Sequence, residues 1–482
     1  MDKQPEILPD LTNPENLVAN FSAFRSNVYR VMRDTNYVAP AASLRPVKNI
    51  LVYTDHANWH TGHHAAVCSL TEQLNEYGYN AILGLCKKPP AEAVPEGVKL
   101  VVNRIIGTTD EGFRQRMQSF RKIVEENDID TVILNSWQGS YKFWDMLILQ
   151  NLFPDEPEKR VRVLLHFHSS FAKPQFELGS NWLRLNTEAV KHFDGLLVNN
   201  EVDAVFWRTY NTRVYYRPLP IQDVPDIQEE SLPKTNDVIY VARFSGVKNQ
   251  LAAINAFQHV AAELPEAKLV LAGDDHDGYQ EKCRVRVAEL GLEDNVEILG
   301  FVAGEEKDRL FRTARCAVNT SRFEGFSQYL CEAKAYSLPV VAYSLPNLTV
   351  LDGAEANGAV IVPKDNPMKL GDALVRVLKD PALQEQLGKA GRAHFEELAS
   401  FDYQEFWKNV FEDMRTEKPP LEEWTTQQKI YASLFDALLT ASRDRDKKKG
   451  PVAALKRAYR KGPDSLKTAY RNLREKAYKA TH

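Results

Sequence analysis

The sequence has few cysteines, and their arrangement does not suit a structural metal site or a disulfide framework. Five cysteines occur among 482 residues, an odd number, and no two of them form a CxxC pair. No group of histidines stands at the spacing of a structural zinc site. These absences favour free thiols in a reducing compartment.

Long apolar runs are also missing. No run approaches the roughly 20 residues that a membrane-spanning helix needs. The opening residues, MDKQPEILPD, are acidic and interrupted by prolines, which is not the pattern of a signal peptide. The length predicts two or three domains, each with its own core. We expect a cytoplasmic protein that can associate peripherally with the inner face of the plasma membrane.

One stretch organises the second half of the chain, SRFEGFSQYLCEAKAYSLPVVA from residue 321 to residue 342. It predicts a loop, a helix over 328–336 and a short buried strand. The helix would begin near Ser327 and point its first N–H groups back at the loop, which favours an anion there. Glu324 and Glu332 stand eight positions apart, and carboxylates accept hydrogen bonds from hydroxyls. The stretch suits a ligand with a diphosphate and several hydroxyls.

A basic loop follows an earlier strand, in DVIYVARFSGVKN from residue 237 to residue 249. The guanidinium of Arg243 can bind two phosphate oxygens, and Lys248 adds a point charge. Together they can neutralise a diphosphate leaving group without a metal. Two basic residues five positions apart are common on solvated surfaces. The position of this pair directly after a predicted strand is what favours a binding role.

These two stretches resemble a known family. The pattern S-x-x-E-G-F-x5-E-A followed by Pro-Val-Val-Ala resembles the E-x7-E signature of retaining glycosyltransferases of the GT-B fold, in particular the family-four group. The basic loop resembles that family's G-R-x4-K-[GN] motif. Three small residues depart from the pattern: Ala242, Ser327 and Ser337 stand where the family usually has glycine.

The resemblance implies an α/β fold with two Rossmann-like doubly wound domains facing a cleft, and with helical extensions at both ends. The expected divisions are an N-terminal helical extension (1–47), an acceptor-side domain (48–215), a linker (216–236), a donor-binding domain (237–400), a helix crossing back to the first domain (401–415) and a basic tail (421–482). Within these, we predict a single helix over 17–33, a helix over 65–77, a last first-domain strand over 195–199 and a strand over 296–302.

The resemblance also implies roles for particular residues. Arg243 and Lys248 would stabilise the departing phosphate, Glu324 would hold the sugar, Glu332 would hold the ribose, and His168 would act at the acceptor side. The remaining donor-binding residues expected from the family pattern are Gly62, Gly300, Phe301, Val302, Gly325, Phe326, Ser327, Gln328 and Tyr329.

Histidines are frequent where ligands are expected in the first domain. His56, His60, His63 and His64 fall in the loop predicted after the first strand, and His166 and His168 follow a later strand. These histidines could hold a metal or contact substrate or water, and contacts to substrate or water are favoured because the loop is polar. We expect no metal and no cofactor.

The C-terminal tail is strongly basic. Residues 443–482 contain 14 Lys or Arg against 4 Asp or Glu. Leu455-Lys-Arg-Ala-Tyr-Arg is followed eleven residues later by the similar Leu466-Lys-Thr-Ala-Tyr-Arg, a spacing that aligns the Leu and Tyr faces of a helix. The tail fits an anionic membrane, an anionic polymer, a partner subunit or a solvated appendage. Contacts to a membrane or polymer are expected from Lys456, Arg457, Arg460, Lys467, Arg471 and Arg474.

The function these observations predict is retaining transfer of a hexose or N-acetylhexosamine from a nucleotide-diphosphate sugar, with a UDP-sugar expected. The acceptor would be a hydroxyl of a glycan, polymer, lipid-linked sugar or protein in cell-envelope or glycoconjugate synthesis. Nucleic acid is not expected, because no nucleic-acid module is present. The alternatives are a glycogen-synthase-like or phosphorylase-like enzyme and a non-catalytic GT-B subunit of a glycosyltransferase complex.

Overall fold

The computed structural model describes most of the first 421 residues and only a few beyond them. The described residues are 11–24, 28–55, 62–104, 109–135, 141–168, 170, 186–187, 189–220, 232–275, 278–345, 354–421, 425–426 and 429–430. The chain divides into two compact units, one of residues 1–173 with 188–421 and one of residues 174–187 with 422–482. The first unit contains both sheets, and the basic tail lies outside the described residues, together with His56 and His60.

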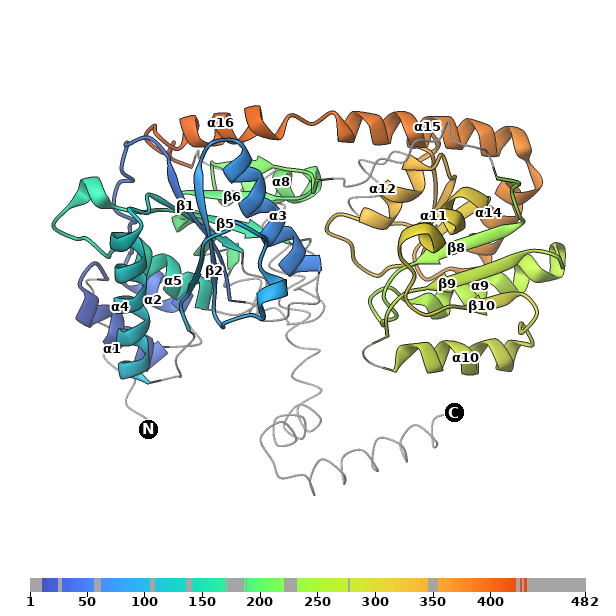
Figure 1. The fold of residues 1–482 in the computed structure, drawn as a ribbon, viewed down its shortest axis with the longest axis horizontal. Coiled ribbons are helices and arrows are strands. Elements are labelled where there is room, and N and C mark those ends of the chain that lie inside the picture. The colour runs from blue at the N-terminus through green and yellow to red at the C-terminus, as the bar shows by residue number, and fades with distance from the viewer. Residues whose placement is uncertain are drawn as a thin grey trace, which may run out of the picture. The chain divides into compact units, whose positions relative to one another are not determined.

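Within the described ranges, the strands form two sheets, and the paired strands run parallel (Figure 1). The seven strands of the first sheet are β1 (Asn49–Thr54), β2 (Asn80–Leu85), β3 (Leu100–Val102), β4 (Thr131–Asn135), β5 (Arg162–Phe167), β6 (Gly195–Val198) and β7 (Val214–Tyr216), in the order β3-β2-β1-β4-β5-β6-β7. The six strands of the second are β8 (Asp237–Val241), β9 (Lys268–Ala272), β10 (Val296–Ile298), β11 (Cys316–Asn319), β12 (Val340–Tyr343) and β13 (Ala359–Val362), in the order β10-β9-β8-β11-β12-β13. The prediction of two doubly wound α/β domains is confirmed.

Helices connect the strands and cover the sheets. The first domain has α1 (Pro14–Phe24), α2 (Val28–Asp34), α3 (Gly62–Glu76), α4 (Asp110–Glu126), α5 (Tyr141–Gln150) and α8 (Glu201–Arg208). The second has α9 (Gln250–Glu263), α10 (Tyr279–Leu290), α11 (Gly304–Thr313), α12 (Gln328–Ala335), α14 (Pro367–Lys379) and α15 (Pro381–Ala399), and α16 (Tyr403–Asp413) follows.

The two faces of the first sheet are buried by different helices, because alternate residues of a strand point to opposite faces. Ile50 and Val52 of β1 belong to the apolar cluster that includes α3 and α16. Tyr53 points the other way and meets Phe120 of α4, with ring centroids 5.4 Å apart. The middle of β1, from Ile50 to Tyr53, is therefore buried on both faces, as expected for a parallel sheet covered on both sides.

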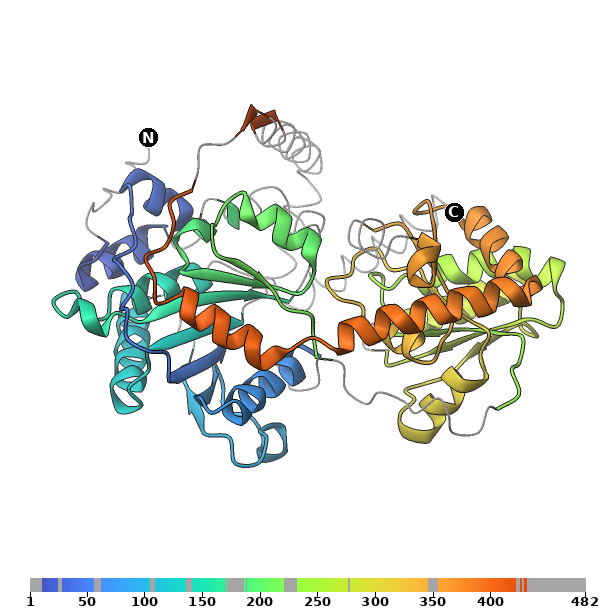
Figure 2. The ribbon, with the colours of Figure 1, turned by 90° about the horizontal axis from the view of Figure 1, so that it is seen from above.

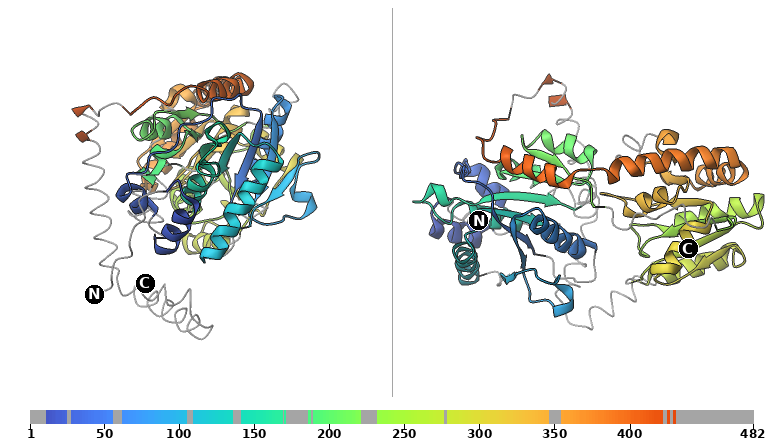
Figure 3. Two further views of the ribbon diagram at one scale, coloured as in Figure 1. Left: turned by 90° about the vertical axis from the view of Figure 1, so that its left-hand side faces the viewer. Right: turned by 45° about the horizontal axis from the view of Figure 1, so that its top comes forward.

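The N-terminal extension braces the first domain. Leu17 and Phe21 of α1 are fully buried. The ring of Phe21 stacks on Phe113 of α4 at 4.1 Å and meets Trp144 of α5 edge-on at 5.3 Å. Figures 1 and 3 show α1 beside α4. The single helix predicted over 17–33 is wrong, since α1 ends at Phe24 and α2 begins at Val28.

Three further predictions about elements are corrected. The helix predicted over 65–77 begins earlier, so Gly62, His63 and His64 belong to α3 and not to a loop. The strand over 195–199 is not the last of its sheet, because β7 pairs beside it. The strand over 296–302 ends at Ile298, and Gly300 to Val302 follow it without strand structure.

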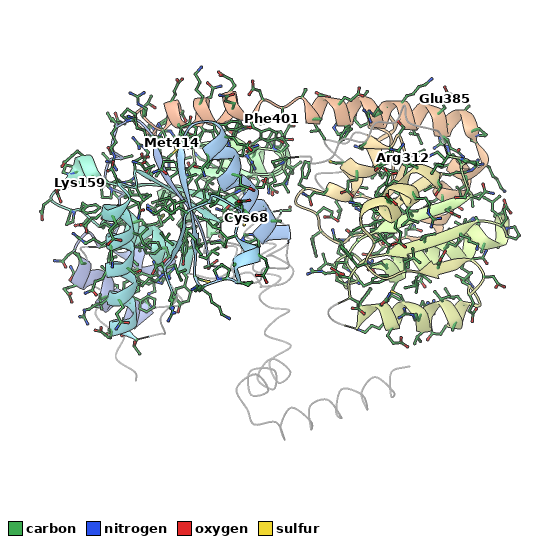
Figure 4. All side chains as sticks on the ribbon, viewed as in Figure 1. Cys68, Lys159, Arg312, Glu385, Phe401 and Met414 are labelled. Carbon is green, nitrogen blue, oxygen red and sulfur yellow. The ribbon has the colours of Figure 1, made fainter. Side chains whose placement is uncertain are left out.

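Helix α16 returns to the first domain after α15 has packed on the second. Trp407, Val410, Phe411 and Met414 are buried in the cluster with α3 and β1. Figure 2 shows α15 along one domain and α16 along the other, and Figure 4 labels Phe401 and Met414 at the two ends of α16. The predicted crossing helix is therefore present. No described helix is both long and apolar enough to cross a membrane.

Ser337, a predicted departure from glycine, occupies a backbone conformation that favours glycine. Its φ is +54°, in the left-handed region, where the Cβ of other residues is strained. We expect Ser337→Gly to raise the free energy of unfolding by about 0.5–1 kcal/mol, measured by urea denaturation. Ser337→Ala is the control for loss of the hydroxyl, and a glycine variant less stable than the alanine variant would contradict this account.

Candidate functional site

The site in the second domain forms where the strand order reverses. β8 pairs with β9 on one side and with β11 on the other, so the loops after β8 and β11 diverge at the carboxyl edge. Parallel α/β sheets bind ligands at such switch points. Arg243 and Lys248 follow β8, and Glu324 follows β11. The topology therefore brings residues about 80 positions apart to one edge.

Buried hydroxyls hold the two loops together. Tyr240 of β8 donates its hydroxyl proton to the Lys248 carbonyl at 2.8 Å and lies 2.9 Å from Ser321 Oγ. Thr320 Oγ1 donates to the Asn249 carbonyl at 2.9 Å. Burial raises the pKa of Tyr240 far above its ordinary value, so the hydroxyl keeps its proton. The backbone around Lys248 is thus fixed independently of any ligand.

Lys248 and Glu324 form an ion pair across these loops. Lys248 Nζ donates to Glu324 Oε1 at 2.7 Å. Glu324 is 7% exposed, whereas the Lys248 side chain is 28% exposed. A buried carboxylate requires a partner, and Lys248 supplies it while keeping part of its ammonium open to the edge. Both predicted residues therefore meet, and the carboxylate is positioned by the lysine.

Arg243 projects from the same edge into solvent. Its side chain is exposed, and it forms no ion pair with any residue that the structure describes. Its backbone is held closely, because Gln250 Nε2 donates to its carbonyl at 3.0 Å and Phe244 N donates to the Asp274 carbonyl at 2.7 Å. An anchored backbone with an open guanidinium suits recognition of an anion.

Helix α12 begins at Gln328, directly after Ser327, which caps it without a side-chain hydrogen bond. Gly325 and Phe326 are half-buried beside this start, and Gln328 is exposed. The side chain of Tyr329 does not face the edge. It is buried, and its hydroxyl donates to the Ile239 carbonyl at 2.5 Å, so the expectation that this side chain binds the donor is corrected.

Glu332 lies one turn into α12 and carries an ion pair of its own. Lys307 Nζ of α11 donates to Glu332 Oε1 at 2.7 Å, and both side chains are 34% exposed. The carboxylate is accessible enough to exchange this partner for hydroxyls. The sequence motif did not point to Lys307.

The predicted base-binding residues follow β10. Gly300 is exposed, Phe301 is 69% exposed, and Val302 is buried. The Gly300 carbonyl accepts from Gly273 N at 2.9 Å, which ties this segment to the end of β9. An exposed aromatic ring on a fixed backbone offers a flat apolar surface of the kind on which a base can stack.

A second polar cluster lies at the carboxyl edge of the first sheet. His166, the fifth residue of β5, has Nδ1 2.9 Å from Asn135 Oδ1 and Nε2 2.9 Å from Asn199 Oδ1. His168 Nε2 lies 2.8 Å from the same Asn135 oxygen. His63 of α3 contacts His168 edge-on, with ring centroids 4.4 Å apart. Gly62, at the first position of α3, precedes His63.

His166 and His168 of this cluster are held neutral. Burial, and then the cation of Arg217, lower the pKa of His166 to about 3. Burial, His166, His63 and Arg217 hold the pKa of His168 well below its ordinary value. Sequence reasoning identified His168 but missed Asn135 and Asn199. Both stand at or directly after the end of a buried strand, which is the signal that could have found them.

Metal ligation finds no support in the described part of the chain, where no group of three or more His, Cys, Asp or Glu side chains is placed to hold an ion. A hydrogen bond from Asn200 Nδ2 to the Gly325 carbonyl at 2.9 Å connects the two edges. Asn200 follows Asn199, and Gly325 follows Glu324. The described chemistry is therefore anion binding and hydroxyl binding by Lys, Arg, His and carboxylate groups.

Part of the chain is similar to known glycosyltransferases. Residues 224–394, which contain the Lys248–Glu324 pair, match the family model described as Glycosyl transferases group 1. A poly(glycerol-phosphate) alpha-glucosyltransferase of Bacillus subtilis is 31% identical over 179 residues, 36% of this chain and 26% of that protein. An uncharacterized glycosyltransferase of Methanocaldococcus jannaschii is 31% identical over 167 residues, 34% of this chain and 41% of that protein. The matches thus span less than half of either relative.

The whole fold recurs in solved structures. HepE of Anabaena, solved in complex with UDP, superposes with a TM-score of 0.59 at 18% identity, over 76% of this chain and 99% of that chain. At this identity the likeness establishes the shared fold of two Rossmann-like domains.

Proposed function

We infer that residues 224–394 are a group 1 glycosyl transferase domain in a chain of GT-B fold. From this premise, we propose that the protein transfers a hexose or N-acetylhexosamine from a nucleotide-diphosphate sugar to an acceptor hydroxyl with retention of configuration. The observation that carries the proposal is the Lys248–Glu324 pair at the switch point of β8 and β11. The exposed Arg243 and the start of α12 belong to the loops at the same edge.

Each part of the donor has a chemically suited group. The cations of Arg243 and Lys248 stabilise negative charge that develops on the departing phosphate. The first N–H groups of α12 point at the same region, and they favour an anion. Glu324 and Glu332 accept hydrogen bonds from sugar and ribose hydroxyls. No step requires a metal, since the two side-chain cations neutralise the leaving group.

UDP-sugars are the first donors to test. Purified protein is mixed with UDP-glucose, UDP-N-acetylglucosamine, UDP-galactose and GDP-mannose without added metal, and binding and slow donor hydrolysis are followed. We expect one UDP-sugar to bind and Arg243→Ala to abolish its turnover. Failure of every donor to bind would favour the non-catalytic subunit.

An anionic acceptor is supported by cations at the carboxyl edge of the first sheet. Lys87 and Lys88 follow β2, and Arg104 follows β3, whose Val102 pairs with Leu85. All three side chains are exposed, and among the described residues none of them forms an ion pair. The Bacillus relative is named for a poly(glycerol-phosphate), a polyanion. We therefore propose a phosphate-bearing polymer of the cell envelope as the acceptor.

Charge reversal tests this acceptor. We expect Lys87→Glu with Arg104→Glu to raise KM for poly(glycerol phosphate) about three- to tenfold at low salt, with a smaller effect at high salt because exposed charges are screened. Lys268→Glu, an exposed change at the amino end of β9, is the control. Equal effects on charged and uncharged acceptors would contradict the proposal.

A further inference from the structure

Asn135 stands at the centre of the histidine cluster, and its orientation is fixed. It is fully buried at the end of β4. Its amide Nδ2 donates to the Ile133 carbonyl at 3.1 Å, and turning the amide over would set oxygen against oxygen. The Oδ1 atom must therefore face the two imidazole rings.

That oxygen decides which nitrogen of His168 carries a proton. Asn135 Oδ1 is only an acceptor, and it lies 2.8 Å from His168 Nε2. A hydrogen bond at this distance requires the proton to be on Nε2. Because the ring is neutral, Nδ1 then carries a lone pair. The neutral ring of His166 has a single N–H, which donates either from Nδ1 to this oxygen or from Nε2 to Asn199 Oδ1, each at 2.9 Å.

Two other histidine rings contact the ring of His168. His63 meets it edge-on at 4.4 Å, and His166 lies tilted against it at 4.0 Å. His63 is itself anchored by Thr54 of β1, whose Oγ1 lies 2.9 Å from His63 Nε2. The cation of Arg217 nearby disfavours a second proton on either ring.

We propose that Asn135 is a positioning residue that holds His168 in the Nε2–H tautomer, so that the ring offers Nδ1 to a substrate hydroxyl as a hydrogen-bond acceptor. The inference rests on the proposed function and deepens it. His168 in this form accepts from a hydroxyl and cannot act as a cation toward phosphate. Arg243 and Lys248 then bind the phosphate charge, and His168 recognises a hydroxyl at the first domain.

Two substitutions of Asn135 separate positioning from packing. Asn135→Ala removes the acceptor, and we expect kcat with the active UDP-sugar to fall about tenfold while the donor KM changes less than twofold. Asn135→Asp keeps the acceptor but adds a charge that favours the imidazolium. The raised pKa of His168 then gives kcat an acidic limb, with activity lost as pH falls through that pKa. The wild type should lack such a limb between about pH 6 and 8, because its pKa lies well below this range.

The matched control is Asn199→Asp, which places a carboxylate beside His166 but not beside His168. We expect its kcat profile to lack the acidic limb. If Asn199→Asp shows the same limb as Asn135→Asp, or if Asn135→Asp shows none, the role assigned to Asn135 is wrong.

A measurement on the unaltered protein keeps the test independent of activity and of folding of the variants. Nitrogen-15 NMR of histidine-labelled protein should show a pyridine-like Nδ1 and a pyrrole-like Nε2 for His168, identified by loss of its signals in His168→Gln. The opposite tautomer would overturn the inference. If this tautomer is found but no donor is turned over, the proposed transferase function fails and the positioning by Asn135 stands.

Discussion

Lys248→Met is expected to lower kcat about 10²- to 10³-fold. The substitution removes the cation that pairs with the buried Glu324 and that, in the proposed function, stabilises the departing phosphate. Methionine keeps most of the length of the lysine side chain, so packing along the stem survives. Glu324 loses its partner, which should also lower the free energy of unfolding by about 1–3 kcal/mol. The measurements are kcat with the active UDP-sugar, the Kd for UDP and urea denaturation.

The chain offers a matched control for this variant. Lys379 and Glu263 form a pair of 2.8 Å on the surface of the same domain, with both side chains about half exposed. Lys379→Met should leave kcat within about twofold and stability within about 1 kcal/mol, because exposed pairs contribute little. A folded Lys248→Met enzyme that keeps kcat within tenfold of wild type would remove Lys248 from the leaving-group site.

Gly273→Ala is expected to cost about 3–5 kcal/mol of unfolding free energy and most of the UDP binding. Gly273 follows β9 with a φ of +149°. A Cβ there would lie 2.2 Å from the Ala242 carbonyl oxygen and 3.0 Å from Arg243 N. The clash is with backbone, so relief requires the start of the Arg243 loop to move. Urea denaturation and calorimetric titration with UDP measure the two effects.

Gly246→Ala is the control for stability in the same loop system. A Cβ at Gly246 would meet only Tyr279 Cε2 at 3.9 Å, an ordinary contact. Its unfolding free energy should stay within about 1 kcal/mol of wild type. Equal stability of Gly273→Ala and Gly246→Ala would show that the β9 end relaxes more easily than the close approach to Ala242 suggests.

Much of the architecture was predictable because it depends on local patterns. Apolar runs of four to six residues between helical stretches are typical of parallel strands covered on both faces, and most of the strands formed where such runs predicted them. The carboxyl ends of these strands then had to share an edge. This is why Lys248 and Glu324, far apart in the sequence, could be expected near one another.

The errors have equally local causes. The polar first turn of α3 lacks an apolar periodicity, so Gly62 and His63 were expected in a loop. Tyr329 was expected at the ligand because the family pattern includes its position, directly after Gln328. On a helix, however, adjacent residues point about 100° apart, and the Tyr329 hydroxyl instead reaches Ile239 in the core.

The sequence by itself determined the two doubly wound domains and the positions of Arg243, Lys248 and Glu324 in loops that follow strands, because these depend on periodicity and on spacing along one chain. Only the tertiary structure decided which partners those residues take. It joined Lys307 to Glu332, buried Glu324 against Lys248, and set Asn135 between two histidines. Such pairings depend on distances between side chains from separate strands and helices, which no local pattern encodes.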